Sequence, residues 1–332
     1  MATVGGTNPT LADVLARTQP DGGVETNLAE VNMQVNEELL TDMTFIEGNL
    51  PTGHQHTIRT GYPSATWRKF NYGVAQTKSR TQQVTDSCGM LEARSEIDEE
   101  LAELNGNAQA WRFSEDKAHI IGMNEQLATA VMYSSTKTDP EKIHGLAPRF
   151  SALTGAATSD QILNAGGTGS DNTSIWLVGW GPEGVFGVYP KGTKAGLEVN
   201  DKGKEPVKDA DSNTYYAYVT QYKWKIGLAV KDWGYVVRIA NIDYSDLVKT
   251  AATGADLVDL MVQASELIKD KTNVRPAFYC SRGIRTWLRR QILNKSNVNL
   301  TFDNVEGKRI LAFDEIPVRR LDAILHTESA LS

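Results

Sequence analysis

The sequence contains almost no cysteine. Among its 332 residues only Cys88 and Cys280 are present, far apart and outside any C-x-x-C pattern. A disulfide framework and a cysteine-rich metal site are therefore excluded, because both need several suitably spaced cysteines. We expect the two residues to be small buried hydrophobic side chains.

Long hydrophobic runs are also missing. No stretch of about 18 apolar residues exists, which is the length that a transmembrane helix needs. Residues 1–20 contain polar residues and prolines where a signal peptide would have a basic and then an apolar stretch. The sequence therefore predicts a protein with no membrane partner that is made and kept in the cytosol.

Positive charge is in the minority. The chain has 34 Lys and Arg against 41 Asp and Glu, a net charge of −7. Dedicated nucleic-acid binders concentrate positive charge to displace counterions from phosphates, so this class is disfavoured. If the chain meets DNA, we expect it to enclose the DNA without reading its sequence. The composition is otherwise that of a globular protein, and the length suits one core plus an extra lobe.

Groups that carry chemistry are scarce as well. The glycine-rich run 166–170 lacks the Gly-Lys-Ser/Thr ending of a phosphate loop and precedes an expected strand, where such a loop needs a helix. His54 and His56 have no third ligand at metal-binding spacing, so we expect solvated strand residues. The carboxylates of 98–103 lack apolar surroundings and predict a solvated helix face. The pattern predicts no catalytic residue, metal or cofactor, and hence no enzyme.

Apolar spacing predicts an arm and three helices in the first part of the chain. Residues 1–28 hold only one short apolar repeat and are expected to form an arm. Apolar residues recur every four positions over 29–46, which predicts a helix. Further helices are expected over 95–104 and 114–133, the latter with Ser114 as its N-cap.

Strands dominate the middle of the chain. Residues 136–173 are rich in glycine and predict irregular structure. Alternating and continuous apolar runs then predict strands over 174–180, 184–190, 215–230 and 235–242, joined by tight turns. We interpret them as an antiparallel meander.

The last third alternates helices with strands. Residues 253–256 resemble a capping box, with Asp in place of the usual Glu, and open a helix that runs to Ile268. Ser281 is expected to cap a second helix. Strands are expected at 276–280, 309–313 and 317–325. The order predicts an α+β lobe.

One segment does not fit a compact monomer. Residues 52–86 are rich in Thr, Arg, Lys and Gln and predict the strands of a long polar hairpin with no core of its own. So long a loop calls for a function or a partner. We expect Trp67 and Phe70 to anchor the contact with such a partner, with Arg68 and Arg80 beside them.

Positive charge is concentrated around one predicted helix. Arg282, Arg285 and Arg289 lie close together, with Arg290 and Lys295 nearby. Arginine suits contact with packaged DNA or with the carboxylates of a neighbouring subunit. A solvated helix surface without a partner is the other interpretation, and the sequence leaves both open.

Several longer strings give a specific resemblance. They are residues 1–15 (MATVGGTNPTLADVL), 46–54 (IEGNLPTGH), 166–176 (GGTGSDNTSIW), 235–241 (YVVRIAN) and 320–325 (RLDAIL). Together they make the chain resemble, along nearly its whole length, the major capsid proteins of podophages and related prophages. The resemblance is close to the coat protein of the Bordetella phage type.

This resemblance implies the α+β coat fold of tailed phages, the Hong Kong 97 or Johnson fold. The implied parts are an N-terminal arm (1–28), a peripheral-domain helix (29–51), an E-loop hairpin (52–90), a peripheral domain with a spine helix and an antiparallel sheet (91–249), an axial domain (250–315), and a C-terminal strand and tail (316–332). In most coat proteins the chain returns from the axial domain to finish the peripheral sheet. Here the strand-dense block 174–242 precedes the block 254–293, so we predict a permuted chain order.

The resemblance also implies a function. Pentamers and hexamers of the chain would form an icosahedral shell that encloses double-stranded DNA, after assembly in the host bacterial cytoplasm. A portal and a decoration or cement protein are the implied partners in the virion capsid. Two alternatives are kept: an encapsulin-like compartment, and a cytosolic α+β hydrolase with 136–173 as an active-site lid.

Overall fold

The computed structural model describes most of the chain in two compact units. It describes residue 34 and residues 36–104, 108–209, 211–249, 256–293, 300–305 and 308–332. Among the described residues, unit 1 comprises those of 90–128 and 196–225 together with Gln34, and unit 2 comprises those of 36–89, 129–195 and 226–332. The predicted arm, 1–28, lies outside the described residues.

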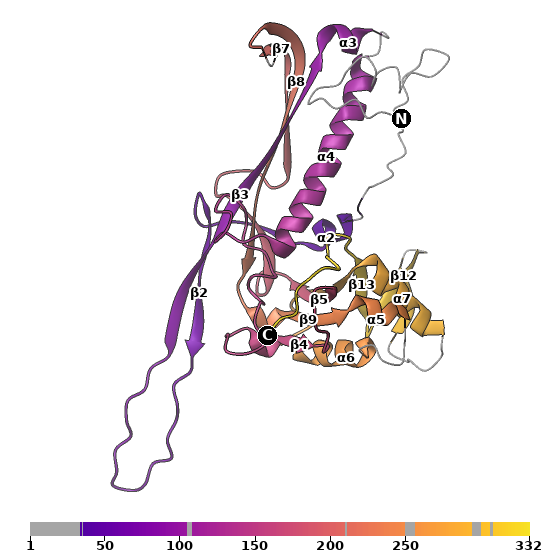
Figure 1. The fold of residues 1–332 in the computed structure, drawn as a ribbon. Helices are drawn as coiled ribbons and strands as arrows, with labels where there is room; N and C mark the ends of the chain where they lie inside the picture. The colour runs from indigo at the N-terminus through magenta and orange to yellow at the C-terminus, as the bar shows by residue number, and fades with distance from the viewer. Residues whose placement is uncertain are drawn as a thin grey trace. The chain divides into compact units, whose positions relative to one another are not determined.

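Figure 1 labels most of the helices and strands. The α-helices are α2 (Glu37–Asp42), α3 (Glu99–Glu103), α4 (Ala108–Tyr133), α5 (Tyr244–Lys249), α6 (Leu257–Leu267) and α7 (Arg282–Leu293). The strands are β1 (Phe45–Glu47), β2 (Gly53–Gly61), β3 (Arg80–Asp98), β4 (Ile162–Asn164), β5 (Asn172–Trp180), β6 (Val185–Tyr189), β7 (Leu197–Lys208), β8 (Thr214–Val230), β9 (Val236–Asp243), β10 (Arg275–Cys280), β11 (Leu300–Val305), β12 (Lys308–Phe313) and β13 (Ile316–Arg320). None of the described helices is both long and apolar enough to cross a membrane.

The main sheet of unit 2 is built around β5 and β10. These two strands pair antiparallel, β9 pairs antiparallel with the other edge of β5, and β13 pairs parallel with β10. Every residue of β5 is buried, which requires cover on both faces because successive side chains point to opposite sides. The sheet is thus the centre of the unit.

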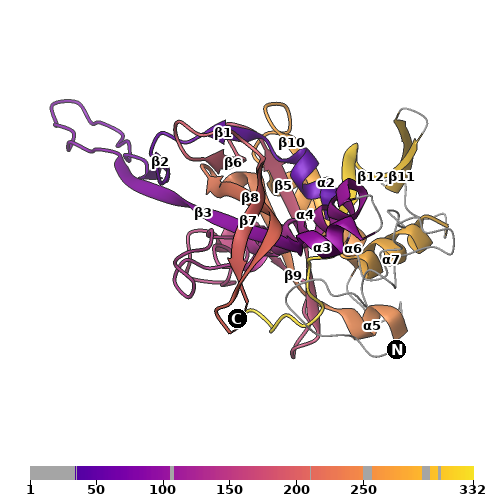
Figure 2. The ribbon, with the colours of Figure 1, turned by 90° about the horizontal axis from the view of Figure 1, so that it is seen from above.

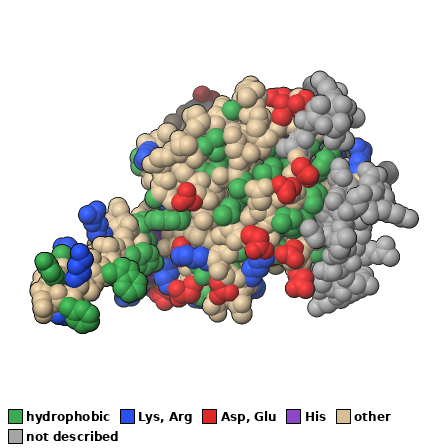
Figure 3. Space-filling model, turned by 90° about the horizontal axis from the view of Figure 1, so that it is seen from below, with side chains coloured by type: hydrophobic (Ala, Val, Ile, Leu, Met, Phe, Trp, Pro, Cys, Tyr) green, Lys and Arg blue, Asp and Glu red, His purple; other side chains and the backbone are tan. Residues whose placement is uncertain are grey.

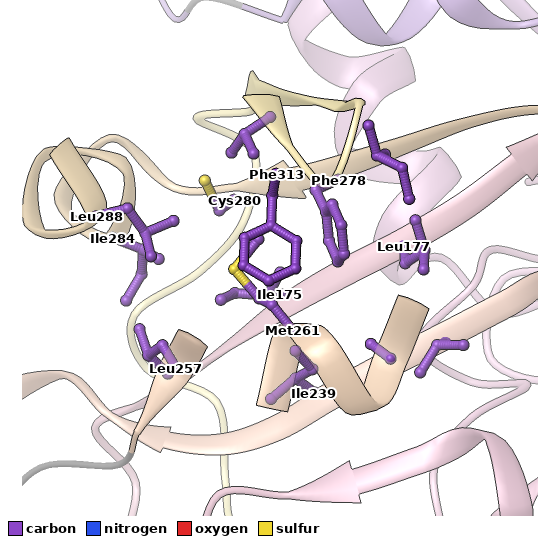
Figure 4. Close-up of a cluster of buried hydrophobic side chains, with 14 of the residues drawn as sticks. Ile175, Leu177, Ile239, Leu257, Met261, Phe278, Cys280, Ile284, Leu288 and Phe313 are labelled. Carbon is purple, nitrogen blue, oxygen red and sulfur yellow. The ribbon is translucent and has the colours of Figure 1, made fainter. Parts of the chain in front are cut away.

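One face of this sheet packs against α6 and α7. Figure 4 shows the side chains that meet there. They are Ile175 and Leu177 of β5, Ile239 of β9, Phe278 and Cys280 of β10, Phe313 of β12, Leu257 and Met261 of α6, and Ile284 and Leu288 of α7. All are almost completely buried. This face of the core therefore joins the predicted α+β lobe to strands from the middle of the chain.

The other face of β5 carries two tryptophans. Trp176 packs edge-on against Phe150, and Trp180 donates a 2.8 Å hydrogen bond from its indole nitrogen to the Tyr279 hydroxyl. That hydroxyl donates in turn to Asp42, which also accepts two 3.1 Å bonds from Arg319. This chain of hydrogen bonds fixes α2 to β10 and β13.

A buried ion pair lies beside Trp176. The Arg238 guanidinium of β9 and the Glu328 carboxylate are 2.9 Å apart, with only 5% and 7% of their side chains exposed. Arg238 also donates to the Phe150 carbonyl at 2.7 Å and lies 4.9 Å from the Trp176 ring. Tyr133 donates its hydroxyl to Glu328 at 2.5 Å. Each charge is thus paired and hydrogen-bonded, which burial requires.

Unit 1 contains a two-stranded ribbon and most of α4. Strands β7 and β8 pair antiparallel from Leu197 opposite Trp224 to Lys208 opposite Thr214, with an irregularity between Asp201 and Gly203. Gly203 has φ +74°, which a glycine adopts without strain. Small apolar clusters, one of them formed by Ile97, Ala102 and Trp111, hold this unit together.

Several element boundaries differ from the predictions. The described part of the predicted helix 29–46 contains α2, which ends at Asp42, because Phe45 and Ile46 leave the helix to pair with β6. The predicted helix 95–104 begins only at Glu99, since β3 extends to Asp98 and Asp98 caps α3. Helix α4 begins at Ala108, so the predicted N-cap Ser114 lies inside it.

The predicted meander is wrong, and the argument for a permuted chain order loses its basis. Strand β8 pairs with β6 and β7, whereas β9 pairs with β5 and β4. Strands β5 and β9 therefore share a sheet and a core with β10, α6 and α7. The permuted order depends on treating the strand-dense block 174–242 and the helix-strand-helix block 254–293 as separate parts, whereas β5 of the first block pairs with β10 of the second. The chain order itself stays a prediction.

Two caps in the last third were predicted, and one of them is confirmed. The Ser281 hydroxyl accepts a bond of 3.5 Å from the Ile284 amide at the start of α7. Helix α6 instead uses Asp256, whose carboxylate accepts from the Asp259 amide, and residues 253–255 lie outside the described residues.

Candidate assembly interfaces

The predicted hairpin exists and ends in an extended loop. Strand β2 pairs antiparallel with β3 from Gly53 opposite Ser87 to Gly61 opposite Arg80. The hairpin loop, residues 62–79, contains neither helix nor strand and connects them as a long excursion (Figures 1 and 2).

Large apolar side chains of the hairpin loop lie in the open. Trp67 is 99% exposed and Phe70 is 96% exposed, and Tyr62 and Tyr72 are also exposed. Figure 3 shows hydrophobic side chains together with Lys and Arg on this extended segment. Exposed aromatic clusters of this kind mark interaction sites in soluble proteins.

The hairpin is also uniformly basic. From Gly48 to Thr85 the chain has no Asp or Glu, although the whole protein is acidic. Its Lys and Arg residues are Arg59, Arg68, Lys69, Lys78 and Arg80, and all of them are exposed. None of these five forms an ion pair with any residue that the structure describes. The loop therefore complements an acidic, partly apolar surface.

A buried ion pair anchors the base of the hairpin. Asp86 of β3 is 4% exposed, and its carboxylate lies 2.7 Å from the Arg149 guanidinium. Arg149 also donates to the carbonyls of His144 and Leu228 at 3.0 and 3.2 Å. The hairpin is thus fixed at its base and unsupported at its tip.

His56 lies beside this ion pair at a cavity of about 170 Å³. It was predicted to be solvated, and this is wrong: only 8% of the residue is exposed. Both of its ring nitrogens are buried without a hydrogen-bond partner. Burial lowers the pKa of His56, with His54 and Arg149 acting in the same direction and Asp86 in the opposite one.

We expect His56 to make the stability of the subunit sensitive to pH. Because its folded-state pKa lies below the ordinary value of 6.5, the unfolded chain takes up the proton first on acidification. The contribution of His56 to the free energy of unfolding is therefore fully present above pH 6.5, and it falls as the pH drops towards the folded-state pKa. His56→Gln should flatten this dependence, measured as urea midpoints at a series of pH values. An unchanged slope would contradict the assignment.

The arginines predicted around α7 do not act as one group. Arg282 lines a cavity of about 520 Å³, together with Arg290 and Arg320. Arg285 is half-buried and Arg289 is exposed, and neither lines this cavity. Arg320 belongs to β13, so the spacing of arginines along α7 could not predict that it lines the same cavity.

The predicted solvated carboxylates are held by partners. Asp98 accepts from the Glu100 and Leu101 amides as the cap of α3. Glu99 and Glu103 both bind the Lys204 ammonium of β7. Within the described part of the chain, no three His, Cys, Asp or Glu side chains are grouped as a metal site would need. The acidic cluster thus joins α3 to the ribbon of unit 1.

The other flagged motifs have structural roles. The run 166–170 leads into β5, as predicted, and Gly169 accepts a bond from the Ala330 amide. Cys280 is buried as predicted, whereas Cys88 is only half-buried, and neither forms a disulfide. Burial raises the pKa of the Cys280 thiol to about 12 and that of Cys88 to about 11. The raised pKa keeps both thiols in the protonated form, which is the weaker nucleophile.

Residues 19–332 match the family model of the major capsid protein GP7. The chain belongs to this family. The structure of bacteriophage Epsilon15 is similar at 37% sequence identity and a TM-score of 0.76, covering 100% of this chain and 99% of that one. No curated protein is detectably similar.

Two further solved structures are similar at much lower sequence identity. The bacteriophage JBD30 capsid matches at 9% identity and a TM-score of 0.47, covering 95% of this chain and 99% of that one. The capsid of a native GTA particle matches at 10% identity and a TM-score of 0.46, covering 71% and 99%.

This member of the GP7 family therefore has the HK97-like α+β capsid fold and is a tailed-phage major capsid protein that forms an icosahedral shell. Its place is the virion capsid, and it is a structural protein, not an enzyme.

Proposed function

We propose that the chain forms pentamers and hexamers that close around double-stranded DNA, and that the hairpin clamps each copy to the next. The observation that carries this proposal is the exposure of Trp67 and Phe70 on a loop with no core of its own. A neighbouring copy would bury these rings. Weak contacts of this kind suffice, because a closed symmetric shell repeats them many times.

We also propose a division of the chain into the parts of the coat fold, supported by the strand pairing and the shared core. The hairpin 52–90 is the E-loop, α4 is the spine helix within 91–249, and 250–315 forms the axial domain together with the strands β5 and β9 that share its sheet. Residues 1–28, 29–51 and 316–332 are the arm, the first peripheral segment and the C-terminal strand and tail.

We further propose a short-tailed phage of the Bordetella type as the source of the shell, supported by the strings at 1–15 and 46–54. A portal and a decoration or cement protein would complete the particle. DNA is enclosed without sequence-specific contacts, as the net charge of −7 favours. The alternative, an encapsulin-like compartment, would carry an enzyme cargo. Genes for a portal and a terminase beside this one would support the phage proposal.

Assembly of the purified chain tests the proposal. We expect closed particles of megadalton mass, or capsomers in equilibrium with them, in sedimentation and in electron microscopy. The hairpin is the reason for this expectation, since Trp67 and Phe70 are almost fully exposed and its Lys and Arg residues form no ion pair with any described residue. A homogeneous monomer at high concentration, under conditions that support phage assembly, would contradict it.

A further inference from the structure

The strongest unexplained feature of unit 2 is the cavity of about 520 Å³ beside α7. We call it the arginine pocket; its lining includes Arg282, Arg290, Arg320, Trp287, Tyr244 and His326. Arg282, Thr286 and Arg290 are spaced four residues apart, so they follow one face of the helix. The opposite face carries Ile284 and Leu288 into the core (Figure 4).

The walls of the arginine pocket are built from packed aromatic rings. The Tyr244 and His326 rings are 4.2 Å apart between centroids. Tyr244 also lies directly over Gly283, where an added Cβ would come within 2.2 Å of the tyrosine hydroxyl. Glycine permits this close approach of α5 to α7. The pocket is lined by these two helices, by Arg320 and by the segment after β13.

The arginine pocket has positive charge that the described part of the copy does not neutralise. Arg320 is paired with Asp322. The side chains of Arg282 and Arg290 form no ion pair with any described residue, and both are exposed. Two guanidinium groups in a pocket that aromatic side chains also line are suited to a carboxylate, which arginine binds through paired hydrogen bonds.

A matching pair of carboxylates lies elsewhere on the same lobe. Asp314 and Glu315, which we call the acidic turn, connect β12 to β13 and are both exposed. Their φ angles are +49° and +66°, in the left-handed region that hairpin turns usually fill with Asn-Gly. Asp314 lies 3.4 Å from Lys271, whereas Glu315 has no partner among the described residues.

The acidic turn and the arginine pocket cannot meet within one copy. The turn precedes Ile316, the first residue of β13, and Arg320 is its last residue. Five residues of strand separate them by roughly 16 Å. Two different patches at opposite ends of one strand join only head to tail between copies, and such contacts close into rings when the rotation allows.

We propose that the acidic turn of one copy binds the arginine pocket of the next copy in the capsomer ring. This inference rests on the proposed assembly and names one of its contacts. The partner is a second copy of this chain, because its exposed Glu315 supplies the negative charge that would neutralise Arg282 and Arg290.

A charge exchange tests the contact. Arg290→Glu and Glu315→Arg, each alone, should raise the protein concentration needed for assembly by about tenfold or more. The two combined should restore assembly towards the wild-type concentration, because the pair is re-formed with reversed signs. Lys194→Glu and Glu141→Lys are the matched controls: each makes the same change of charge at an exposed residue that belongs to neither the arginine pocket nor the acidic turn.

A third variant separates contact from folding. Asp314→Asn with Glu315→Gly gives the turn its preferred residues while removing both charges, so the subunit should be at least as stable and yet assemble poorly. Sedimentation, electron microscopy and thermal unfolding are measured for every variant.

The outcomes are distinguishable. If wild type and controls form shells and Arg290→Glu does so equally well, the inference is overturned and the proposed function stands. Shells that form normally but hold less DNA would overturn it in favour of phosphate as the ligand. Single variants that fail without rescue by the combination would also overturn it. If the wild type forms no shells, the proposed function fails first.

Discussion

Replacing Trp67 and Phe70 together with alanine is expected to abolish shells while leaving the subunit folded. A buried aromatic side chain removes about 150–250 Å² from water, which at about 25 cal/mol per Å² corresponds to about 4–6 kcal/mol for each ring. In the free subunit the two rings are 99% and 96% exposed, so their loss empties no core. The free energy of unfolding should change by less than about 0.5 kcal/mol.

Circular dichroism and sedimentation of the same samples check both halves of this expectation. Trp67→Phe with Phe70→Leu is the matched control, since it retains apolar anchors at both positions and should still assemble. Normal shells from the double alanine variant would show that the hairpin loop is not the clamp.

Replacing Arg238 with methionine should have the largest effect on the stability of the subunit. The substitution leaves the Glu328 carboxylate buried without its partner at 2.9 Å. Loss of one member of a buried ion pair costs about 3–5 kcal/mol. Urea unfolding of the dissociated subunit measures this loss. Glu328 also accepts hydrogen bonds from the Tyr133 and Ser174 hydroxyls. These bonds reduce the cost of burying the carboxylate but do not neutralise its charge.

An exposed ion pair provides the comparison. Lys231 and Glu183 are 2.9 Å apart with 39% and 63% of their side chains exposed. Lys231→Met should therefore cost at most about 1 kcal/mol. Equal losses for Lys231→Met and Arg238→Met would show that the Arg238 pair is not effectively buried.

Local patterns predicted the elements that depend on local chemistry. The apolar runs that became β5, β6 and β9 were identified, because a fully buried strand needs continuous apolar residues. The hairpin at 52–86 was identified from its lack of apolar residues. Strand β7, at Leu197–Lys208, was missed because most of its side chains are exposed and only its pairing with β8 makes it a strand.

Pairing between distant segments explains the other errors. Nothing within 174–180 indicates that this strand pairs with β9 on one side and with β10 on the other, so the sequence does not reveal that it shares a sheet with the block 254–293. The same holds for the sites: Arg282 was flagged from its neighbours on α7, whereas Arg320 comes from another strand and enters the pocket only through the fold. His56 became a buried residue because Arg149 and Asp86 meet beside it.

The ion pair of Arg238 and Glu328 also affects when unit 2 can fold during translation. The two residues are 90 positions apart in the chain. At ordinary translation rates the ribosome needs roughly 5–20 seconds to travel that distance. During this interval the nascent chain has a guanidinium that its core cannot accept, because the neutralising carboxylate does not yet exist. The buried ion pair of unit 2 can therefore form only after Glu328 has been made, and contacts between copies that need the folded unit wait for it.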